Sequence, residues 1–240
     1  MKKITKYIPT IILTLLCSCS DYLDIVPDNV TTLDIVFNNR NTAERYLANC
    51  YHFVPDHGSV KRIPGMGAGH ECWFYTTNDS HFDNEVSFYI ARGLQNIDAP
   101  YANYWDGEGG SNLPMFRAIR ECNIFLDYVR DQHKVNDLTD SERKRWIAEV
   151  NVLKAYYHFF LFEHYGPIPI VDKALPVSTD PEGVKVTRMP VDQIVDYMVK
   201  LIDDSYKDLP PVITMEATEM GRLTQPAAVS YTHLTLPTIA

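Results

Sequence analysis

The residues Leu16-Cys17-Ser18-Cys19 have the types and the order of a bacterial lipid-attachment site. They follow a lysine-rich start and a short apolar run over 11–16, which is too short to span a bilayer and is typical of a signal peptide. Cys19 is the expected attachment residue because the small Ser18 directly precedes it and the aliphatic Leu16 stands three positions before it. The chemistry expected here is therefore acylation of the Cys19 thiol.

We expect residues 1–18 to be a removed signal peptide and Cys19 to begin the mature chain outside the cytoplasm. Two or more acyl chains would hold such a chain stably on a membrane, whereas one chain would give marginal binding. An ordinary cleaved signal peptide, with Cys19 present by coincidence, is the alternative interpretation of the same residues.

Other residues that could carry chemistry match no known reactive or metal-binding pattern. The spacing of the histidines and the cysteine between residues 52 and 81 fits neither His-Glu-x-x-His nor paired Cys-x-x-Cys ligands; these are His52, His57, His70, Cys72 and His81. The glycine-rich run 65–69 follows no predicted strand and lacks the Lys-Ser/Thr ending of a phosphate-binding loop. The stretch 106–117 begins like a calcium loop, but Arg117 occupies the position that needs Glu. The sequence therefore predicts no cofactor, no metal site and no enzyme activity.

The net charge of the 240-residue chain is −9, and it becomes more negative in the predicted mature protein. Removal of residues 1–18 takes away three lysines and no acid, which leaves 19 Lys and Arg against 31 Asp and Glu, or −12. An acidic chain is a poor ligand for phosphate backbones, so we expect no nucleic-acid partner. Three cysteines remain beyond the attachment site; the pattern predicts that Cys50 and Cys122 are buried in helices and assigns Cys72 no role.

Capping signals and apolar spacing predict long helices separated by one long loop. Capping boxes at 41–44 and 139–142 predict helices to about Val54 and to about Tyr165. Apolar residues spaced by three and four predict another helix from Pro114 to Val129, and Pro190 opens a further one. The stretch 55–113, between the helix that ends near Val54 and the helix that begins at Pro114, is irregular and rich in Gly, Asn, Asp and aromatic residues.

These elements predict an all-α fold of tetratricopeptide-like helical pairs with a long, aromatic-rich loop insertion. The Ala155-x3-Phe159 spacing and the following Pro167 fit half of the tetratricopeptide signature. Trp146 and Tyr157 share an apolar stripe and are expected in the core, whereas the charge run 142–145 is expected to be a solvated helix face.

The last residues of the chain conflict with the pattern before them. A capped helix start at 224–228 is followed by β-branched residues and Pro237. The string 230–238 also resembles translated sequencing adapter. We therefore expect residues 229–240 to be a non-native tail, with native sequence that stops near Ala228 and continues differently in the natural protein; a genuine C-terminal tail is the alternative.

The motifs together resemble the N-terminal part of SusD/RagB-type outer-membrane nutrient-binding lipoproteins. The strongest match is the helix that leads into a Tyr-Gly-Pro-Ile-Pro turn. The matching stretches are 19–27, 43–47, 90–96, 118–126, 145–150, 153–159, 165–169 and 221–224. On this resemblance residues 19–228 are an incomplete SusD-like N-terminal domain.

The resemblance implies a helical scaffold anchored to the outer membrane and facing outward. It implies capture of oligosaccharides, sometimes peptides, for a SusC-like TonB-dependent transporter, and binding without cleavage. The alternative for the same helices is a tetratricopeptide-type scaffold lipoprotein that binds only protein. A glycan-processing enzyme is a third possibility, against which the missing catalytic constellation stands.

A sugar site of this kind combines flat aromatic faces with a few placed hydrogen-bonding groups. The loop offers Trp73 or Tyr75 as a stacking platform, with Asn78, Asp79 and Arg92 as hydrogen-bonding groups. Trp105 is a further candidate for ligand contact, although anchoring of the loop on the helices is the favoured interpretation of this residue. Arg92 could likewise serve as a structural ion-pair partner. Tyr101, Tyr104 and Asp106 lie in the same loop.

Overall fold

The computed structural model describes residues 32–59, 64–69, 86–98, 100–107, 113–176 and 181–235, and these divide into two units. Helix α2 (Leu33–Val36) belongs to the first unit, Met1–Val36. All other described elements belong to the second unit, Phe37–Ala240. Within the described residues, no helix combines the length and the apolar character that crossing a membrane requires.

The second unit is built from five main helices. These are α3 (Arg40–His52), α6 (Met115–Val129), α7 (Asp140–Tyr165), α8 (Val191–Asp203) and α10 (Gln225–Thr235). Short helical turns connect them: α4 (Pro64–Gly67), α5 (Val86–Ala91), η1 (Pro181–Val184), η2 (Tyr206–Asp208) and α9 (Glu216–Glu219). The described residues contain no strand, so the predicted all-α class and its helical pairs are confirmed.

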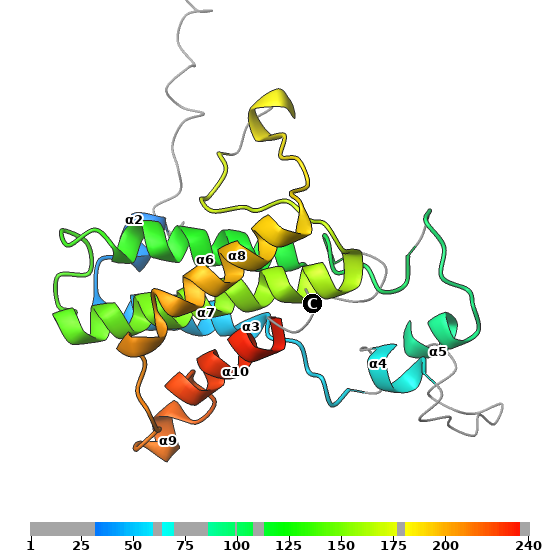
Figure 1. Cartoon of the computed structure of the whole chain (residues 1–240). Coiled ribbons are helices and arrows are strands. Elements are labelled where there is room, and N and C mark those ends of the chain that lie inside the picture. The colour runs from blue at the N-terminus through cyan, green and yellow to red at the C-terminus, as the bar shows by residue number, and fades with distance from the viewer. Residues whose placement is uncertain are drawn as a thin grey trace, which may run out of the picture. The chain divides into compact units, whose positions relative to one another are not determined.

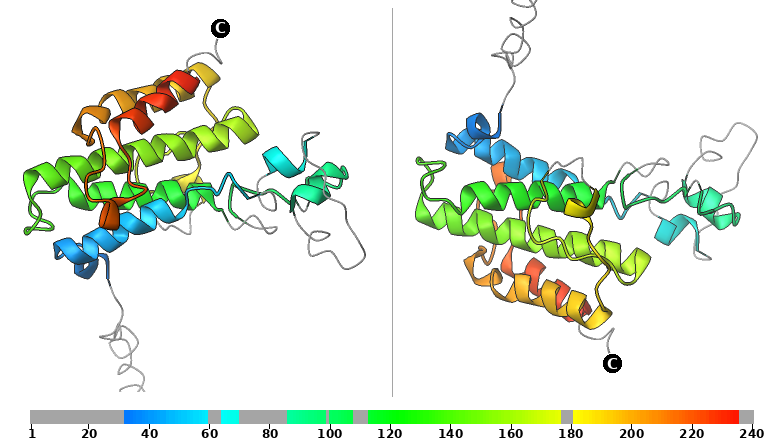
Figure 2. Two further views of the ribbon diagram at one scale, coloured as in Figure 1. Left: turned by 90° about the horizontal axis from the view of Figure 1, so that it is seen from below. Right: turned by 90° about the horizontal axis from the view of Figure 1, so that it is seen from above.

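Helix α7 lies at the centre of this unit. It runs between α3 and α6 on one side and α8 and α10 on the other, as both views in Figure 2 and the helix contacts agree. A helix covered on both sides must be apolar around much of its circumference. Accordingly, fifteen of its 26 residues are buried, including Trp146 and Tyr157, which confirms their predicted place in the core. The ribbon in Figure 1 shows α7 among α3, α6, α8 and α10.

Local sequence determines where α7 begins and ends. The side chain of Thr139 accepts from the backbone N–H of Glu142, and the Glu142 side chain reaches back to Thr139, which confirms the predicted capping box. Gly166 ends the helix with φ +67, a left-handed conformation that glycine adopts without strain. The other predicted box was wrong: α3 starts at Arg40, and its cap is the side chain of Asn39, which accepts from Thr42 N–H at 3.1 Å.

Aromatic and sulfur side chains fill the contact between α3 and α6. The ring of Phe37 stacks on Tyr128 with centroids 4.6 Å apart and meets Phe125 edge-on. Cys50 and Cys122 are both fully buried free thiols, as the sequence predicts. The hydrogen bond with the Cys122 thiol, together with burial, raises the pKa of Cys50. These thiols therefore act as small apolar core residues.

Helix α10 begins where the capped start at 224–228 predicts it, and it continues through Thr235. Gln225 N–H donates to the carbonyl of Pro210, and Ala228 is fully buried. The prediction that the native sequence stops near Ala228 stays a prediction, because a helical conformation does not distinguish native from foreign residues.

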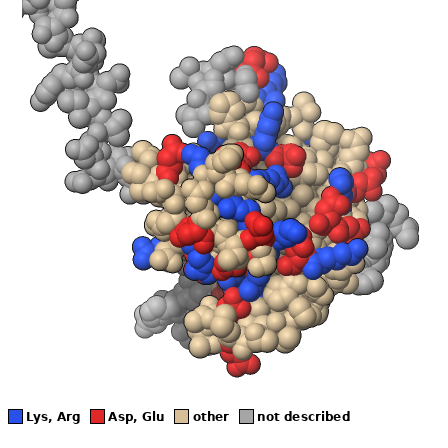
Figure 3. Space-filling view, turned by 90° about the vertical axis from the view of Figure 1, so that its left-hand side faces the viewer, with Lys and Arg blue, Asp and Glu red and all other residues tan. Residues whose placement is uncertain are grey.

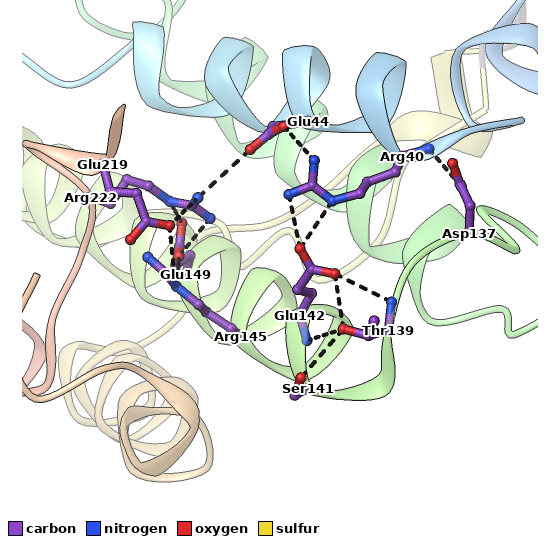
Figure 4. Close-up of polar contacts among 10 residues, drawn as sticks. All are labelled: Arg40, Glu44, Asp137, Thr139, Ser141, Glu142, Arg145, Glu149, Glu219 and Arg222. Carbon is purple, nitrogen blue, oxygen red and sulfur yellow. Dashed lines mark hydrogen bonds and ion pairs between the residues drawn. The ribbon is translucent and has the colours of Figure 1, made fainter. Parts of the chain in front are cut away.

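A buried carboxylate, Glu149, joins α7, α3 and the segment before α10 (Figure 4). Its side chain is 0% exposed. Arg222 binds both of its oxygens, at 2.9 and 3.1 Å, and Arg145 binds one at 3.0 Å. Tyr51 on α3 donates to it at 2.8 Å and accepts from the Leu223 N–H at 3.1 Å. We call Glu149 with these partners the Glu149 cluster.

The cluster extends along the helices through further ion pairs. Glu219 accepts from both Arg145 and Arg222. At the start of α7, Glu142 accepts from Arg40 at 2.9 and 3.0 Å, and Arg40 also reaches Glu44 (Figure 4). Basic and acidic side chains are interspersed over much of the face in Figure 3, as expected where charges pair locally.

The expectation that the run 142–145 is a solvated face was therefore wrong for three of its four residues. Arg143 is 8% exposed and its guanidinium donates to the carbonyls of Val129, Asp131, Lys134 and Val135. Glu142 and Arg145 belong to the ion pairs above. Lys144 alone is exposed. Here a run of charged residues on a helix makes contacts with neighbouring parts of the protein. The sequence pattern alone does not distinguish such a run from a solvent-exposed helix face.

The Glu149 cluster predicts a large stability loss when its central charge is removed. Glu149→Gln leaves Arg222 and Arg145 without their buried carboxylate, and breaking such a pair costs about 3–5 kcal/mol. We expect the unfolding free energy of the full chain, measured by urea denaturation with circular dichroism, to fall by about 3 kcal/mol.

Glu163→Gln is the matched control for this measurement. Glu163 lies on the same helix, is exposed and makes no ion pair within the described residues. Its replacement should change the free energy by less than about 0.5 kcal/mol. A loss below about 1 kcal/mol for Glu149→Gln would show that the cluster does not hold the helices together.

Candidate functional site

Trp105 forms one wall of a pocket of about 230 Å³ between the start of α6 and the segment 167–176. Phe116 on α6 forms the second aromatic wall, with its ring centroid 4.6 Å from that of Trp105. The aliphatic lining comes from the segment after α7 and from beyond η1; these residues are Pro169, Val171, Leu175 and Val186. Arg120 and Lys173 complete the lining. The pocket thus combines flat apolar faces with a few charged groups, the composition expected of a small-ligand site.

The end of α7 positions Trp105. The hydroxyl of Tyr165 accepts from the Tyr104 N–H at 2.8 Å and donates to the Ala102 carbonyl at 3.3 Å. The rings of Tyr165 and Trp105 meet edge-to-face, with centroids 5.6 Å apart. Trp105 is consequently held half-buried against the helices, so its predicted anchoring role is confirmed while the same ring also faces the pocket.

The turn after Trp105 requires glycine. Gly107 has φ +86, and a Cβ on it would lie 2.9 Å from the ring of Pro114. Gly107 thus lies against Pro114, directly before α6, and the Met115 N–H donates to the Tyr104 carbonyl at 2.9 Å. The turn therefore sets the distance between Trp105 and Phe116.

Buried polar side chains on α6 and α7 hold the segment that forms the pocket floor. Asn123 donates to the Val171 carbonyl at 3.0 Å, and the Val171 N–H donates to His158 at 3.4 Å. Lys154 donates to both the carbonyl and the carboxylate of Asp172, each at 2.8 Å. Because an extended segment without a partner strand needs other acceptors and donors for its backbone, these side chains take the place of a strand.

Burial and the Lys154–Asp172 contact shift the pKa of each of these two groups in opposite directions. Burial lowers the pKa of Lys154 by more than Asp172 raises it. Burial raises the pKa of Asp172, but the ammonium of Lys154 and the hydroxyl of Tyr197 lower it by more. The Tyr197 hydroxyl donates to the same carboxylate at 2.9 Å, so Asp172 is directed toward α7 and α8.

His158 is fully buried below this segment. Burial is the main cause that lowers its pKa to about 4, and the nearby Lys154 charge adds to it. The neutral ring fits its contacts, because Nδ1 donates to the Lys154 carbonyl and Nε2 accepts from Val171.

Of the site residues that the sequence predicts and the structure describes, Trp105 lines the pocket and Arg92 does not. Trp73, Tyr75, Asn78 and Asp79 lie outside the described residues. Arg92 is exposed just after α5 and does not line the Trp105 pocket.

The other loop aromatics take structural positions. Tyr104 is fully buried, with its ring edge-on to Phe160. Tyr101 is stacked on Tyr89, with ring centroids 4.3 Å apart. Of the loop aromatics that the structure describes, Trp105 alone lines this pocket.

Sequence reasoning missed most of the pocket. Phe116 and Arg120 lie on α6 but outside the apolar stripe that predicts this helix. Lys173, Leu175 and Val186 lie in segments without a helical or strand periodicity. One signal in the sequence could have indicated the pocket: the charged Arg120 lies on α6 three residues before the buried polar Asn123.

A second pocket, of about 530 Å³, lies where α4 approaches the end of α7. Phe160, Glu163, His164 and His57 contribute to its lining, and Nε2 of His57 lies 2.5 Å from the hydroxyl of Tyr156. Among the residues that the structure describes, no three His, Cys, Asp or Glu side chains lie close enough to hold a metal ion.

The family model of SusD-like proteins, described as starch-binding and associating with the outer membrane, matches residues 21–236. No curated protein sequence matches the chain. The fold resembles that of several solved proteins whose sequences are only distantly similar.

Three of these solved structures illustrate the likeness. A laminarin-binding SusD-like protein has a TM-score of 0.63 at 16% identity over 84% of this chain and 40% of its own. A SusD-like carbohydrate-binding protein from Bacteroides fragilis has 0.60 at 22% identity, over 83% and 37%. Surface glycan-binding protein A from Bacteroides thetaiotaomicron, solved with laminarihexaose, has 0.58 at 17%, over 83% and 39%. The chain therefore shares their fold and spans about two fifths of their length.

The buried His158 predicts a specific pH dependence of stability. Its pKa is about 4 in the folded chain and about 6.5 when unfolded, so the unfolded chain binds more protons between these values. The stabilisation is complete above pH 6.5 and is lost as the pH falls toward 4, by on the order of 3 kcal/mol. We expect His158→Gln to flatten this slope in urea titrations between pH 7 and 4.5.

His133→Gln is the control, because His133 is exposed. Acid groups with lowered pKa values, such as Asp172, contribute the same slope to all three proteins. An unchanged slope in His158→Gln would contradict the neutral, buried state of this ring.

Proposed function

Because the chain belongs to the SusD-like family, we propose that it belongs to an outer-membrane lipoprotein that captures oligosaccharides and delivers them to a SusC-like TonB-dependent transporter. The Trp105 pocket is the observation of this structure that supports the proposal. Its aromatic walls offer flat faces to the C–H groups of a sugar ring, and Arg120 and Lys173 add polar groups to its lining.

The predicted loop residues extend the proposed binding surface. Trp73 or Tyr75 is proposed as a stacking platform, and Asn78, Asp79 and Arg92 as partners for sugar hydroxyls. Trp105 would then contact ligand from a position held by α6 and α7, which suits a binding protein because a rigid wall loses little entropy on binding.

Binding without cleavage is part of the proposal. Glycoside hydrolysis commonly needs two facing carboxyl groups on either side of the bond that is cut. The lining of the Trp105 pocket, as far as the structure describes it, includes no Asp or Glu. Asp172, which stands between the lining residues Val171 and Lys173, is engaged by Lys154 and Tyr197.

Attachment to the membrane through Cys19 completes the proposal. A ligand-capturing protein that serves a transporter must stay at the membrane, and a diacylated cysteine keeps it there. The outward orientation and the transporter partner rest on the family resemblance.

The proposal predicts that aromatic truncation weakens glycan binding. Loss of one stacked ring removes about 2 kcal/mol of apolar contact, or roughly thirtyfold in Kd. We expect Trp105→Ala, and the double variant Trp73→Ala with Tyr75→Ala, to weaken retention of the full chain by starch or laminarin in affinity electrophoresis by at least about tenfold.

Tyr206→Ala on η2 is the control, since Tyr206 does not line the pocket. Circular dichroism of each variant separates lost binding from lost folding. Unchanged retention of the folded double variant would show that the loop assignment is wrong, and release of shortened sugars would show that the protein is an enzyme.

The anchor predicts a difference between two neighbouring cysteines. We expect Cys19→Ser to abolish labelling with radioactive palmitate and to release the protein from the membrane fraction of a bacterial host. Cys17→Ser should leave both unchanged, because Leu16 before Cys17 does not fit the attachment position. Equal labelling of the wild type and Cys19→Ser would exclude Cys19 as the lipid site.

A further inference from the structure

Positive charge gathers around the Trp105 pocket. Arg120 and Lys173 line it. The guanidinium of Arg188 lies over the Trp105 ring, 5.2 Å from its centroid. Three cations thus surround one small apolar pocket in a chain with 31 acidic and 22 basic residues.

None of these three cations pairs with a carboxylate among the described residues. Arg120 donates to the carbonyl of Leu175, and Arg188 donates to the carbonyl of Pro167 at 3.0 Å. A guanidinium has five N–H donors, so each of these bonds leaves others available. Lys173 makes no hydrogen bond or ion pair with the described part of the chain, and its side chain is exposed.

Three nearby acidic groups are committed elsewhere. Asp172, next to Lys173, accepts from Lys154 and Tyr197. Glu121, next to Arg120, accepts from Tyr46 and lies 3.9 Å from Arg117. Glu182 pairs with Lys185 at 3.3 Å. The pocket therefore keeps an excess of positive charge that these acids do not neutralise.

We propose that the Trp105 pocket recognises a sugar ring that carries an anionic group, either the carboxylate of a uronic acid or a sulfate ester. The ring would lie against Trp105 and Phe116, and the anion would lie at Arg120 and Lys173. The inference rests on the proposed glycan-binding function and specifies its ligand class.

The size of the pocket agrees with a single ring. Sites for drug-sized ligands span about 300–1,000 Å³, whereas this pocket has about 230 Å³. One residue of a longer chain fits this space. The charge of the ligand gives the specificity, because the apolar walls would accept many rings alike, whereas hydrogen bonds to a charged group are stronger than those between neutral groups.

Three matched monosaccharides test the inference: glucose, glucuronate and glucose 6-sulfate, which differ at one carbon. Dissociation constants for the full chain are measured by ligand-observed saturation-transfer NMR. We expect glucuronate or glucose 6-sulfate to bind at least tenfold more tightly than glucose. The tighter of the two identifies carboxylate or sulfate as the source of the charge, and high salt should reduce the preference.

Two variants locate the effect. Lys173→Gln removes an exposed charge without removing a described contact, and it should reduce the preference severalfold; Arg120→Gln should do the same. Lys207→Gln changes the net charge equally but lies on η2, outside the pocket lining, and should leave the preference intact.

The outcomes separate this inference from the proposed function. Retention by starch or laminarin without any preference for the anionic sugars would overturn the inference alone. The same conclusion follows if the preference survives Lys173→Gln and Arg120→Gln. Failure to bind any saccharide, neutral or anionic, would overturn both.

Discussion

The carboxylate of Glu149 is the constraint on which the arrangement of the helices depends. A buried charge is costly unless it is paired and hydrogen-bonded, so Arg222, Arg145 and Tyr51 must meet it in one geometry. These partners come from three separate parts of the chain, on α3, on α7 and before α10. The cluster therefore selects one relative position of these helices, whereas apolar contacts alone would allow them to slide past one another.

The central position of α7 explains the pocket. A helix covered on both sides has few free faces, so its buried polar residues must find partners at its ends and edges. Lys154 and His158 form hydrogen bonds with the backbone of the segment 171–172. Tyr165, in the last turn of α7, forms hydrogen bonds with the backbone of Ala102 and Tyr104. The same helix thereby positions both the floor and the Trp105 wall of the candidate site.

The helices were predictable from the sequence because capping residues and apolar spacing act locally, as at Thr139 and along 115–129. The pocket was not, because its walls come from segments far apart in sequence that share no periodicity, as with Phe116 and Val186. Arg143 illustrates the same limit. Its charge suggested exposure to solvent, but its guanidinium is buried and donates to four carbonyls at the end of α6 and in the connection to α7. The family resemblance rested on several motifs that follow one another along the chain. The match of the SusD-like family model over residues 21–236 confirms this resemblance.

The three tryptophans of the chain offer the most direct test of the account. Trp146 is a core residue that is 1% exposed, Trp105 lines the pocket, and Trp73 is the proposed loop platform. Oxidative footprinting with mass spectrometry, with and without a bound polysaccharide, reports each ring separately. The account predicts that ligand protects Trp105 and Trp73 while Trp146 stays unreactive throughout. Unchanged oxidation of Trp105 and Trp73 at saturating ligand would contradict it.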